Sequence, residues 1–130
     1  MKIIVRLVAL IAALNAGTVV ADEFSMPFGL AAIPGARLAI SDAYDTAGGD
    51  REESIARFGT QVAREEVISF YRNALEEARF EIYSSSDRPD YAMIAGKRDD
   101  DRITVYYKNQ SDWVEADEGE LSVKAEYNKQ

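Results

Sequence analysis

A single segment of the chain has helical periodicity, and it limits the folds open to the rest. Within residues 63–79 the apolar side chains form one stripe about 100° wide. The stripe consists of Val67, Phe70, Tyr71, Ala74, Leu75 and Ala78. Glu65 and Glu66 fall in the first turn, where the helix dipole favours negative charge. A helix with one apolar stripe must bury it against another element, so the remaining segments have to supply an apolar surface.

The other regular segments alternate apolar and polar residues, which is typical of half-buried strands. Before the helix these are residues 36–41, with Ala36, Leu38 and Ile40 on one face, and residues 53–60, with Ala56 and Phe58 inward. After the helix they are residues 80–84, a hairpin of 91–98 and 102–109, and residues 120–127. The predicted fold class is therefore α+β, in the order ββαββββ. We expect two layers: an antiparallel sheet of five to six strands with one main helix on one face.

The predicted core combines the helix stripe with the inward strand positions. It consists of Leu38, Phe58, Val67, Phe70, Tyr71, Leu75, Leu121 and Val123. The chain has no cysteine, so no disulfide replaces such a core. We divide the chain into residues 1–21, an extended lead-in at 22–35, and a single α+β domain at 36–130.

Residues 1–21 have the pattern of a secretory signal peptide. Lys2 and Arg6 precede a short apolar run at residues 7–14, and small residues follow up to Ala21. An uncleaved anchor is the alternative, but the run is shorter than the roughly 20 residues of a membrane-spanning helix. We expect cleavage after Ala21, a periplasmic or secreted location, and no stable membrane anchor after cleavage.

The charge and composition exclude several functions. Cleavage would leave 109 residues with 13 basic and 23 acidic side chains, a net charge of −10. A chain this acidic repels phosphate backbones, so nucleic acid is not an expected partner. The chain has no His and no Cys, which excludes His-based catalytic triads, thiol catalysis and zinc–thiolate sites. No cofactor is expected.

Part of the chain resembles a known domain pattern. Pro34, Gly35 and Ala36 open a strand, Thr60 ends the next, and the following helix carries the motif Val-x-x-Phe-Tyr-Arg at residues 67–72. Over residues 33–80 this is similar to a domain family of bacterial secreted proteins and lipoproteins whose functions are mostly uncharacterised. The family helix commonly ends with a glycine and an aromatic residue, whereas this chain has Ala78, Arg79 and Phe80. The resemblance implies the fold and export, and it implies no catalytic residues.

Candidate binding residues lie on the sheet face away from the helix and in one loop. They are Tyr83, Tyr106, Lys108, Lys124 and Trp113. Tyrosines on an open sheet and a single tryptophan in an acidic loop are suitable contacts for a protein or a glycan. The alternative is that the tyrosines pack only against neighbouring side chains and that Trp113 folds back onto the sheet edge.

Candidate cation ligands lie in two turns that the strand order places at the same end of the sheet. They are Asp42, Asp45 and Asp50 in one turn, and Asp99, Asp100 and Asp101 in the other. Such oxygens suit Ca²⁺, although aspartate also favours turns for its own sake. A second acidic loop, with the same two interpretations, contains Asp112, Glu115, Asp117, Glu118 and Glu120.

The sequence therefore predicts an exported, non-enzymatic domain that acts by binding an envelope protein. One alternative is a domain that binds a small ligand in the crevice between helix and sheet, or Ca²⁺ at the aspartate-rich end. A further alternative is a hydrolase that uses a carboxylate pair.

Overall fold

The computed structural model describes residues 26–46 and 49–129. The predicted signal peptide and its cleavage site at Ala21 lie outside these ranges. A short 3-10 turn, η1 (Pro27–Gly29), precedes the main elements. These are β1 (Arg37–Asp45), β2 (Arg51–Thr60), α2 (Arg64–Glu77), β3 (Glu81–Asp87), β4 (Tyr91–Arg98), β5 (Asp101–Lys108) and β6 (Gly119–Asn128).

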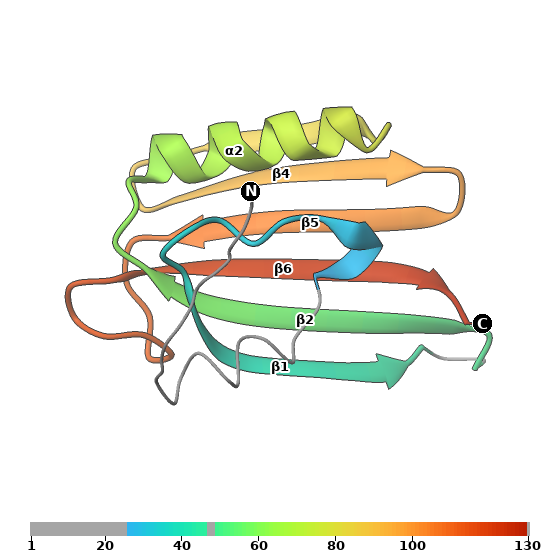
Figure 1. Cartoon of the computed structure of the whole chain (residues 1–130), viewed down its shortest axis with the longest axis horizontal. Helices are drawn as coiled ribbons and strands as arrows, with labels where there is room; N and C mark the ends of the chain where they lie inside the picture. Colours follow the sequence, from blue (N-terminus) through green and yellow to red (C-terminus); the bar gives the residue numbers. More distant parts are fainter. Residues whose placement is uncertain (1–25, 47–48, 130) are drawn as a thin grey trace, which may run out of the picture.

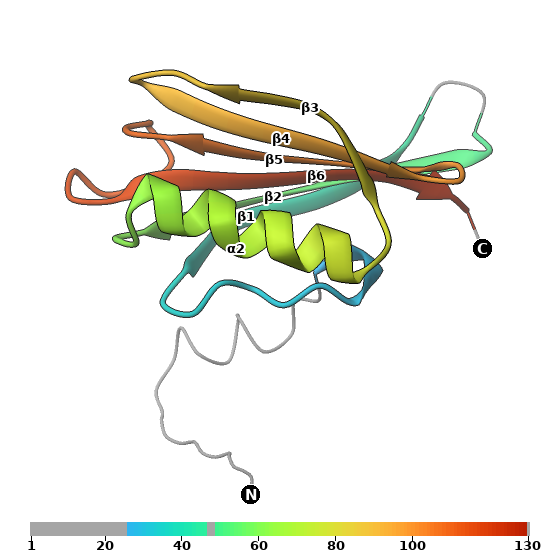
Figure 2. The ribbon, with the colours of Figure 1, turned by 90° about the horizontal axis from the view of Figure 1, so that it is seen from above.

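The six strands form one antiparallel sheet in the order β1-β2-β6-β5-β4-β3 (Figure 1 and Figure 2). Helix α2 lies over one face, where it contacts β3, β4 and β5 (Figure 2). We call this the inner face and the opposite one the open face. The predicted α+β class, with a six-strand antiparallel sheet and one main helix, is confirmed.

The core lies between α2 and the inner face. Val67, Tyr71 and Leu75 of α2 have no exposed surface. They meet fully buried residues from the three central strands, namely Ile94, Ile103, Val105, Leu121 and Val123. Phe58 extends this cluster onto β2. Six of the eight predicted core residues are therefore buried: Phe58, Val67, Tyr71, Leu75, Leu121 and Val123.

The segment of residues 26–35 covers the part of the inner face that α2 leaves free. It runs beside α2 on the same side of the sheet (Figure 2). Met26 and Ile33 are buried in the core. The centroid of the Phe28 ring lies 5.1 Å from the centroid of the Phe80 ring. The backbone N–H of Ile33 donates a 3.0 Å hydrogen bond to the Tyr71 hydroxyl. The described part of the predicted lead-in thus belongs to the packed domain.

Two predicted core residues are only partly buried. Leu38 lies on edge strand β1, which lacks a strand on one side. Phe70 lies on the flank of the helix stripe, with its ring centroid 4.9 Å from that of Tyr71 in an edge-to-face contact. Because Phe70 faces the 26–35 segment instead of the sheet, it belongs to the rim of the core.

Each edge strand contains an irregularity that changes which side chains point inward. In β1 the register shifts between Leu38 and Ile40, so Ile40 pairs with Arg57 on the open face and is 40% exposed. The predicted alternation of Ala36, Leu38 and Ile40 on one face is therefore wrong, because a bulge adds one residue to the strand. In β3 a second shift lies between Ile82 and Ser84.

Helix α2 ends without the glycine that such ends usually require. Arg79 takes a left-handed conformation with φ of 72°. Its N–H bonds to the Glu76 carbonyl at 3.0 Å, and the Phe80 N–H bonds to the Leu75 carbonyl at 2.9 Å. This is a Schellman motif, and the burial of Phe80 at 4% exposure holds it in place.

Candidate functional site

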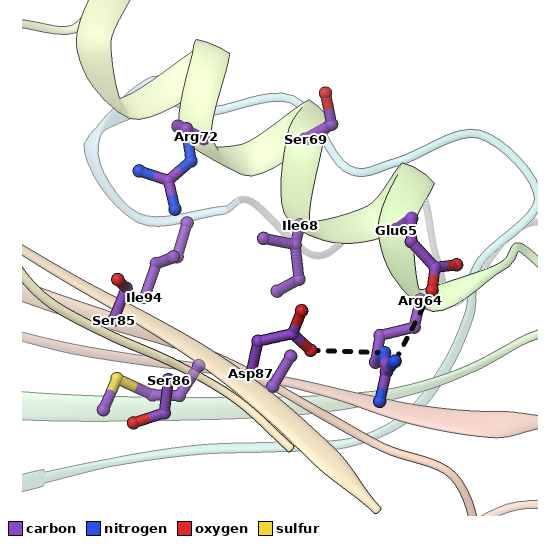
Figure 3. A pocket seen from close by; sticks show the side chains of 11 residues that line it. Arg64, Glu65, Ile68, Ser69, Arg72, Ser85, Ser86, Asp87 and Ile94 are labelled. Atoms are coloured by element: carbon purple, nitrogen blue, oxygen red, sulfur yellow. Dashed lines mark hydrogen bonds and ion pairs between the residues drawn. The ribbon is translucent and has the colours of Figure 1, made fainter. Parts of the chain in front are cut away.

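A groove of about 330 Å³ separates α2 from β3 and β4 (Figure 3). We call it the α2–β3 groove. Its floor is apolar: Ile68 is partly exposed there, and the buried side chains of Ala92 and Ile94 lie beneath it. Its rim is polar and includes Arg64, Glu65, Ser69, Arg72, Ser85 and Asp87. A crevice with an apolar floor and a few polar groups is the usual form of a small-molecule site.

The spacing of residues in two elements produces this lining. Arg64, Ile68 and Arg72 are four residues apart, so they lie one above another along the side of α2 that faces β3. On β3, Ser85 pairs with Ile94 and Asp87 pairs with Ala92, which places both on the helix side of the sheet. The groove therefore has a basic wall on the helix and a hydroxyl and carboxylate wall on the strand.

Arg64 closes the end of the groove near the start of α2. Its Nε lies 3.7 Å from Asp87 Oδ1, and its Nη2 lies 3.5 Å from Glu65 Oε2 (Figure 3). Its Nη1 also donates to the Arg88 carbonyl. These contacts attach the first turn of α2 to the turn between β3 and β4. The charge of Arg64 is thus balanced within the protein.

Arg72 differs, because within the described residues it has no ion pair or hydrogen bond. Its side chain is half-buried. Figure 3 shows its guanidinium projecting from α2 toward Ser85 and Ile94. Removing a charge from water is costly unless the charge is paired. The groove therefore offers a planar cation, with several N–H donors, to a carboxylate or phosphate group.

A second hollow, of about 500 Å³, lies on the open face and brings together three predicted binding residues. We call it the open-face pocket; its lining includes Ile55, Arg57, Tyr106, Lys108, Glu120 and Lys124. Tyr106 pairs with Ser122, and Lys108 pairs with Glu120, across the β5–β6 ladder. Tyr106 is 36% exposed.

The other two predicted binding residues lie outside this pocket. Tyr83 is on β3, two strands away from β5, where it lies against Lys97 with Nζ 5.7 Å from the ring centroid. Trp113 stacks on Arg57, whose guanidinium carbon is 5.2 Å from the ring centroid. Because Trp113 still has 48% of its surface exposed, it partly folds back and partly faces water.

Glu120 is the one buried acid of the open-face pocket. Its side chain is 1% exposed, and its Oε2 accepts hydrogen bonds from Arg57 Nη1 at 2.9 Å and from the Ser122 hydroxyl. Burial acts to raise the pKa of Glu120, but hydrogen bonding from Ser111, Ser122 and Arg57 outweighs it and lowers the pKa. The carboxylate is therefore ionised at neutral pH.

Contrary to the prediction, Asp42 and Asp45 lie within β1, while Asp50, Asp99 and Asp100 lie in the two turns at the same end of the sheet. Several of the predicted aspartates are engaged by basic residues. Arg51 donates to the Asp100 carbonyl at 2.5 Å, Lys129 pairs with Asp45 at 3.1 Å, and Arg98 pairs with Asp101 at 3.1 Å. Asp42 caps its neighbour's N–H, and Asp99 occupies a turn with φ of 53°. Among the residues described, no group of three acids could hold a metal ion.

The second acidic loop is tied to the sheet by ion pairs and hydrogen bonds. Glu118 Oε1 lies 2.6 Å from Arg37 Nη2 and also accepts the Glu115 N–H at 3.0 Å. Asp117 accepts a hydrogen bond from Gln61 at 2.6 Å. These contacts fold the loop over the end of the open face beside Gly59, where a side chain would collide with Glu118.

Fold and groove together define a class of protein: a one-helix α+β domain whose helix and sheet enclose a ligand-sized crevice. A family model described as START domain-like matches residues 40–124, well over half of the chain. The chain belongs to this START domain-like family. Comparisons with curated proteins and with solved structures gave no match.

Sequence reasoning missed the groove residues for an identifiable reason. The predicted helix stripe was defined by apolar residues alone, and Arg72 is not among them. The spacing of Arg64, Ile68 and Arg72 would have marked a second, mixed face.

Within residues 26–46 and 49–129, no helix has the length and apolar character needed to cross a membrane.

Proposed function

We propose that this domain binds a small anionic amphiphile in the α2–β3 groove. The observation that carries the proposal is the half-buried guanidinium of Arg72, which has no partner among the described residues, beside the partly exposed apolar side chain of Ile68. The anionic head of the ligand pairs with Arg72, and its apolar body lies on the floor. Membership of the START domain-like family is compatible with a ligand-binding role.

The size of the groove limits the ligand. At about 30 Å³ per water-sized volume, 330 Å³ holds about a dozen non-hydrogen atoms. Octanoate, an eight-carbon carboxylate, fits this limit. With about −0.3 kcal/mol or better for each of its ten non-hydrogen atoms, or about −3 kcal/mol, its Kd is expected on the order of 10 mM or tighter.

The test compares one charged and one neutral ligand on three proteins. Octanoate and 1-octanol are titrated into the wild type, Arg72→Gln and Arg79→Gln, and binding is followed by the backbone amide shifts of α2, β3 and β4. Arg79 is the matched control, because it is an exposed arginine just beyond the end of α2. Glutamine keeps the polar side chain and removes the charge in both variants.

A charge-assisted hydrogen bond contributes about 1.5–3 kcal/mol, so Arg72→Gln should weaken octanoate binding by about tenfold or more. It should leave 1-octanol binding unchanged, and Arg79→Gln should change neither. Equal loss of both ligands in Arg72→Gln would mean that Arg72 only supports the groove. Shifts outside the groove, or no shifts at all, would contradict the proposed site.

Export and the absence of catalysis are further parts of the proposal. A general acid needs a raised carboxyl pKa. The pKa values of Glu53, Glu118 and Glu120 are lowered, because hydrogen bonds to each carboxylate outweigh the effect of burial, which is the opposite of what a general acid needs. Export is tested by fractionating the producing cells and sequencing the N-terminus of the chain. The first residue should be Asp22, and a chain retained in the cytoplasm with Met1 intact would refute export.

An envelope protein that docks on the open face is the second candidate function. The observation in its favour is that Tyr106, Lys108 and Lys124 share one hollow on that face. Cross-linking of the exported chain in native envelope should then yield one dominant protein, and Tyr106→Ala should abolish the cross-link without lowering the unfolding midpoint. A yield unaffected by Tyr106→Ala would reject this surface.

A further inference from the structure

The open-face pocket has a feature that the α2–β3 groove lacks, namely a buried acceptor without a donor. Glu120 lines the pocket with a side chain that is 1% exposed. Its Oε2 accepts two hydrogen bonds, whereas its Oε1 has no hydrogen-bond partner among the described residues. Ser111 also acts to lower the pKa of Glu120, but the structure contains no hydrogen bond from its hydroxyl to Oε1.

An unsatisfied buried carboxylate oxygen is costly for a protein, and a ligand that donates to it recovers that cost. Oε1 is shielded from water, so a ligand must first shift a side chain of the pocket wall. Oε1 therefore favours a ligand with several hydrogen-bond donors, because such a ligand can first bind the accessible part of the pocket and then donate to Oε1.

The charge of the pocket is opposite to that of the whole protein. Arg57, Lys108 and Lys124 line it, against Glu120 and Asp90, although the chain has a net charge of −8. Arg57 pairs with Glu120, and Lys124 pairs with Glu53 at 3.1 Å. Lys108 has no ion pair within the part of the chain described, so one cation is free to bind an anionic group.

The pocket also presents an aromatic surface. Tyr106 is 36% exposed and stands between Lys108 and Thr104 on the same face of β5. An exposed tyrosine ring offers an apolar face and a hydroxyl, which suits the C–H face of a sugar ring. Trp113, stacked on Arg57 at the pocket wall, extends this surface.

We propose that the open-face pocket binds an acidic saccharide. The sugar hydroxyls donate to Glu120 Oε1, the sugar carboxylate pairs with Lys108, and the ring lies on Tyr106. A ligand ammonium would also satisfy Oε1, but it would have to enter among Arg57, Lys108 and Lys124, which repel it. A neutral hydroxyl donates without that penalty.

The experiment is an amide-shift titration of the full mature chain with three probes of similar length. Trigalacturonate is the acidic saccharide, maltotriose the neutral one and trilysine the cationic one. The variants are Tyr106→Ala, Lys108→Ala and Glu120→Gln, with Tyr83→Ala as the matched control because Tyr83 is an exposed tyrosine of the same sheet outside the pocket.

Trigalacturonate should shift amides of β5 and β6, and maltotriose should bind more weakly. Trilysine should not shift these amides. Tyr106→Ala should weaken trigalacturonate binding about fivefold, and Lys108→Ala about threefold, as for an exposed ion pair. Tyr83→Ala should leave it unchanged. Glu120→Gln should also weaken trigalacturonate binding if this variant folds. If it does not fold, the proposal is decided by comparing Tyr106→Ala with Tyr83→Ala.

Three results would overturn the proposal. The first is equal binding of trigalacturonate and maltotriose, which removes the role of Lys108. The second is an equal effect of Tyr83→Ala and Tyr106→Ala, which indicates a broad protein-docking face in place of a pocket. The third is shifts confined to α2 and β3, which assigns the saccharide to the groove.

Discussion

Replacing Tyr71 by phenylalanine removes one hydroxyl from the contact between α2 and the 26–35 segment. Tyr71 has no exposed surface, and its hydroxyl accepts the Ile33 N–H at 3.0 Å. The variant leaves that N–H buried without a partner, which costs about 1–3 kcal/mol. Urea unfolding at pH 7 should therefore show a lower midpoint with an unchanged slope, and amide exchange at Ile33 should accelerate.

The same residue predicts a pH dependence. Burial raises the pKa of Tyr71 from 10.0 to about 12, partly opposed by the Ile33 N–H. The folded state therefore holds the phenolic proton more tightly than the unfolded state. This stabilisation is complete below pH 10 and is lost as the pH rises through 12, by about 1.36 kcal/mol per pKa unit, or roughly 3 kcal/mol in total.

The assay is urea unfolding from pH 9 to pH 12 on wild type, Tyr71→Phe and the exposed control Tyr83→Phe. Wild type and Tyr83→Phe should lose stability in parallel, while the loss in Tyr71→Phe should be smaller by about 2 kcal/mol or more. Parallel curves for wild type and Tyr71→Phe would refute the burial of this hydroxyl. So would an unchanged midpoint at pH 7.

Two further predictions concern packing. Gly119→Ala places a methyl group against the Tyr107 ring and should cost about 1–3 kcal/mol by overpacking, measured by urea unfolding; a neutral effect would mean that the ring moves freely. Phe70→Ala should cost about 2 kcal/mol, less than Leu75→Ala, because Phe70 is half-buried and Leu75 has no exposed surface; the reverse order would contradict the assignment of Phe70 to the core rim.

Local periodicity was sufficient to predict much of the fold. The α2 stripe identified Val67, Tyr71 and Leu75, and alternation identified the hairpin of β4 and β5 as well as the inward residues of β6. These patterns depend on neighbours in sequence and on one buried face, so composition and spacing suffice.

Features that depend on distant contacts could not be predicted in this way. The β1 bulge turns Ile40 outward, although the alternation of the strand gives no sign of it. Ile33 is buried because of Tyr71, a residue 38 positions away. Glu120 is buried on the nominally open face because Arg57 pairs with it and the acidic loop folds over that end of the sheet. By contrast, part of the open-face pocket could be predicted. Strand alternation placed Tyr106, Lys108 and Lys124 on one face of the sheet, and the pocket brings them together.

The two irregular edge strands have a consequence for the protein in concentrated solution. An unpaired strand edge is a template onto which another chain can add a strand, and repeated addition produces fibres. In both β1 and β3 the register shift breaks the regular row of N–H and C=O groups partway along the strand. A strand added from another chain would therefore meet an interrupted ladder at either edge, which disfavours edge-to-edge association.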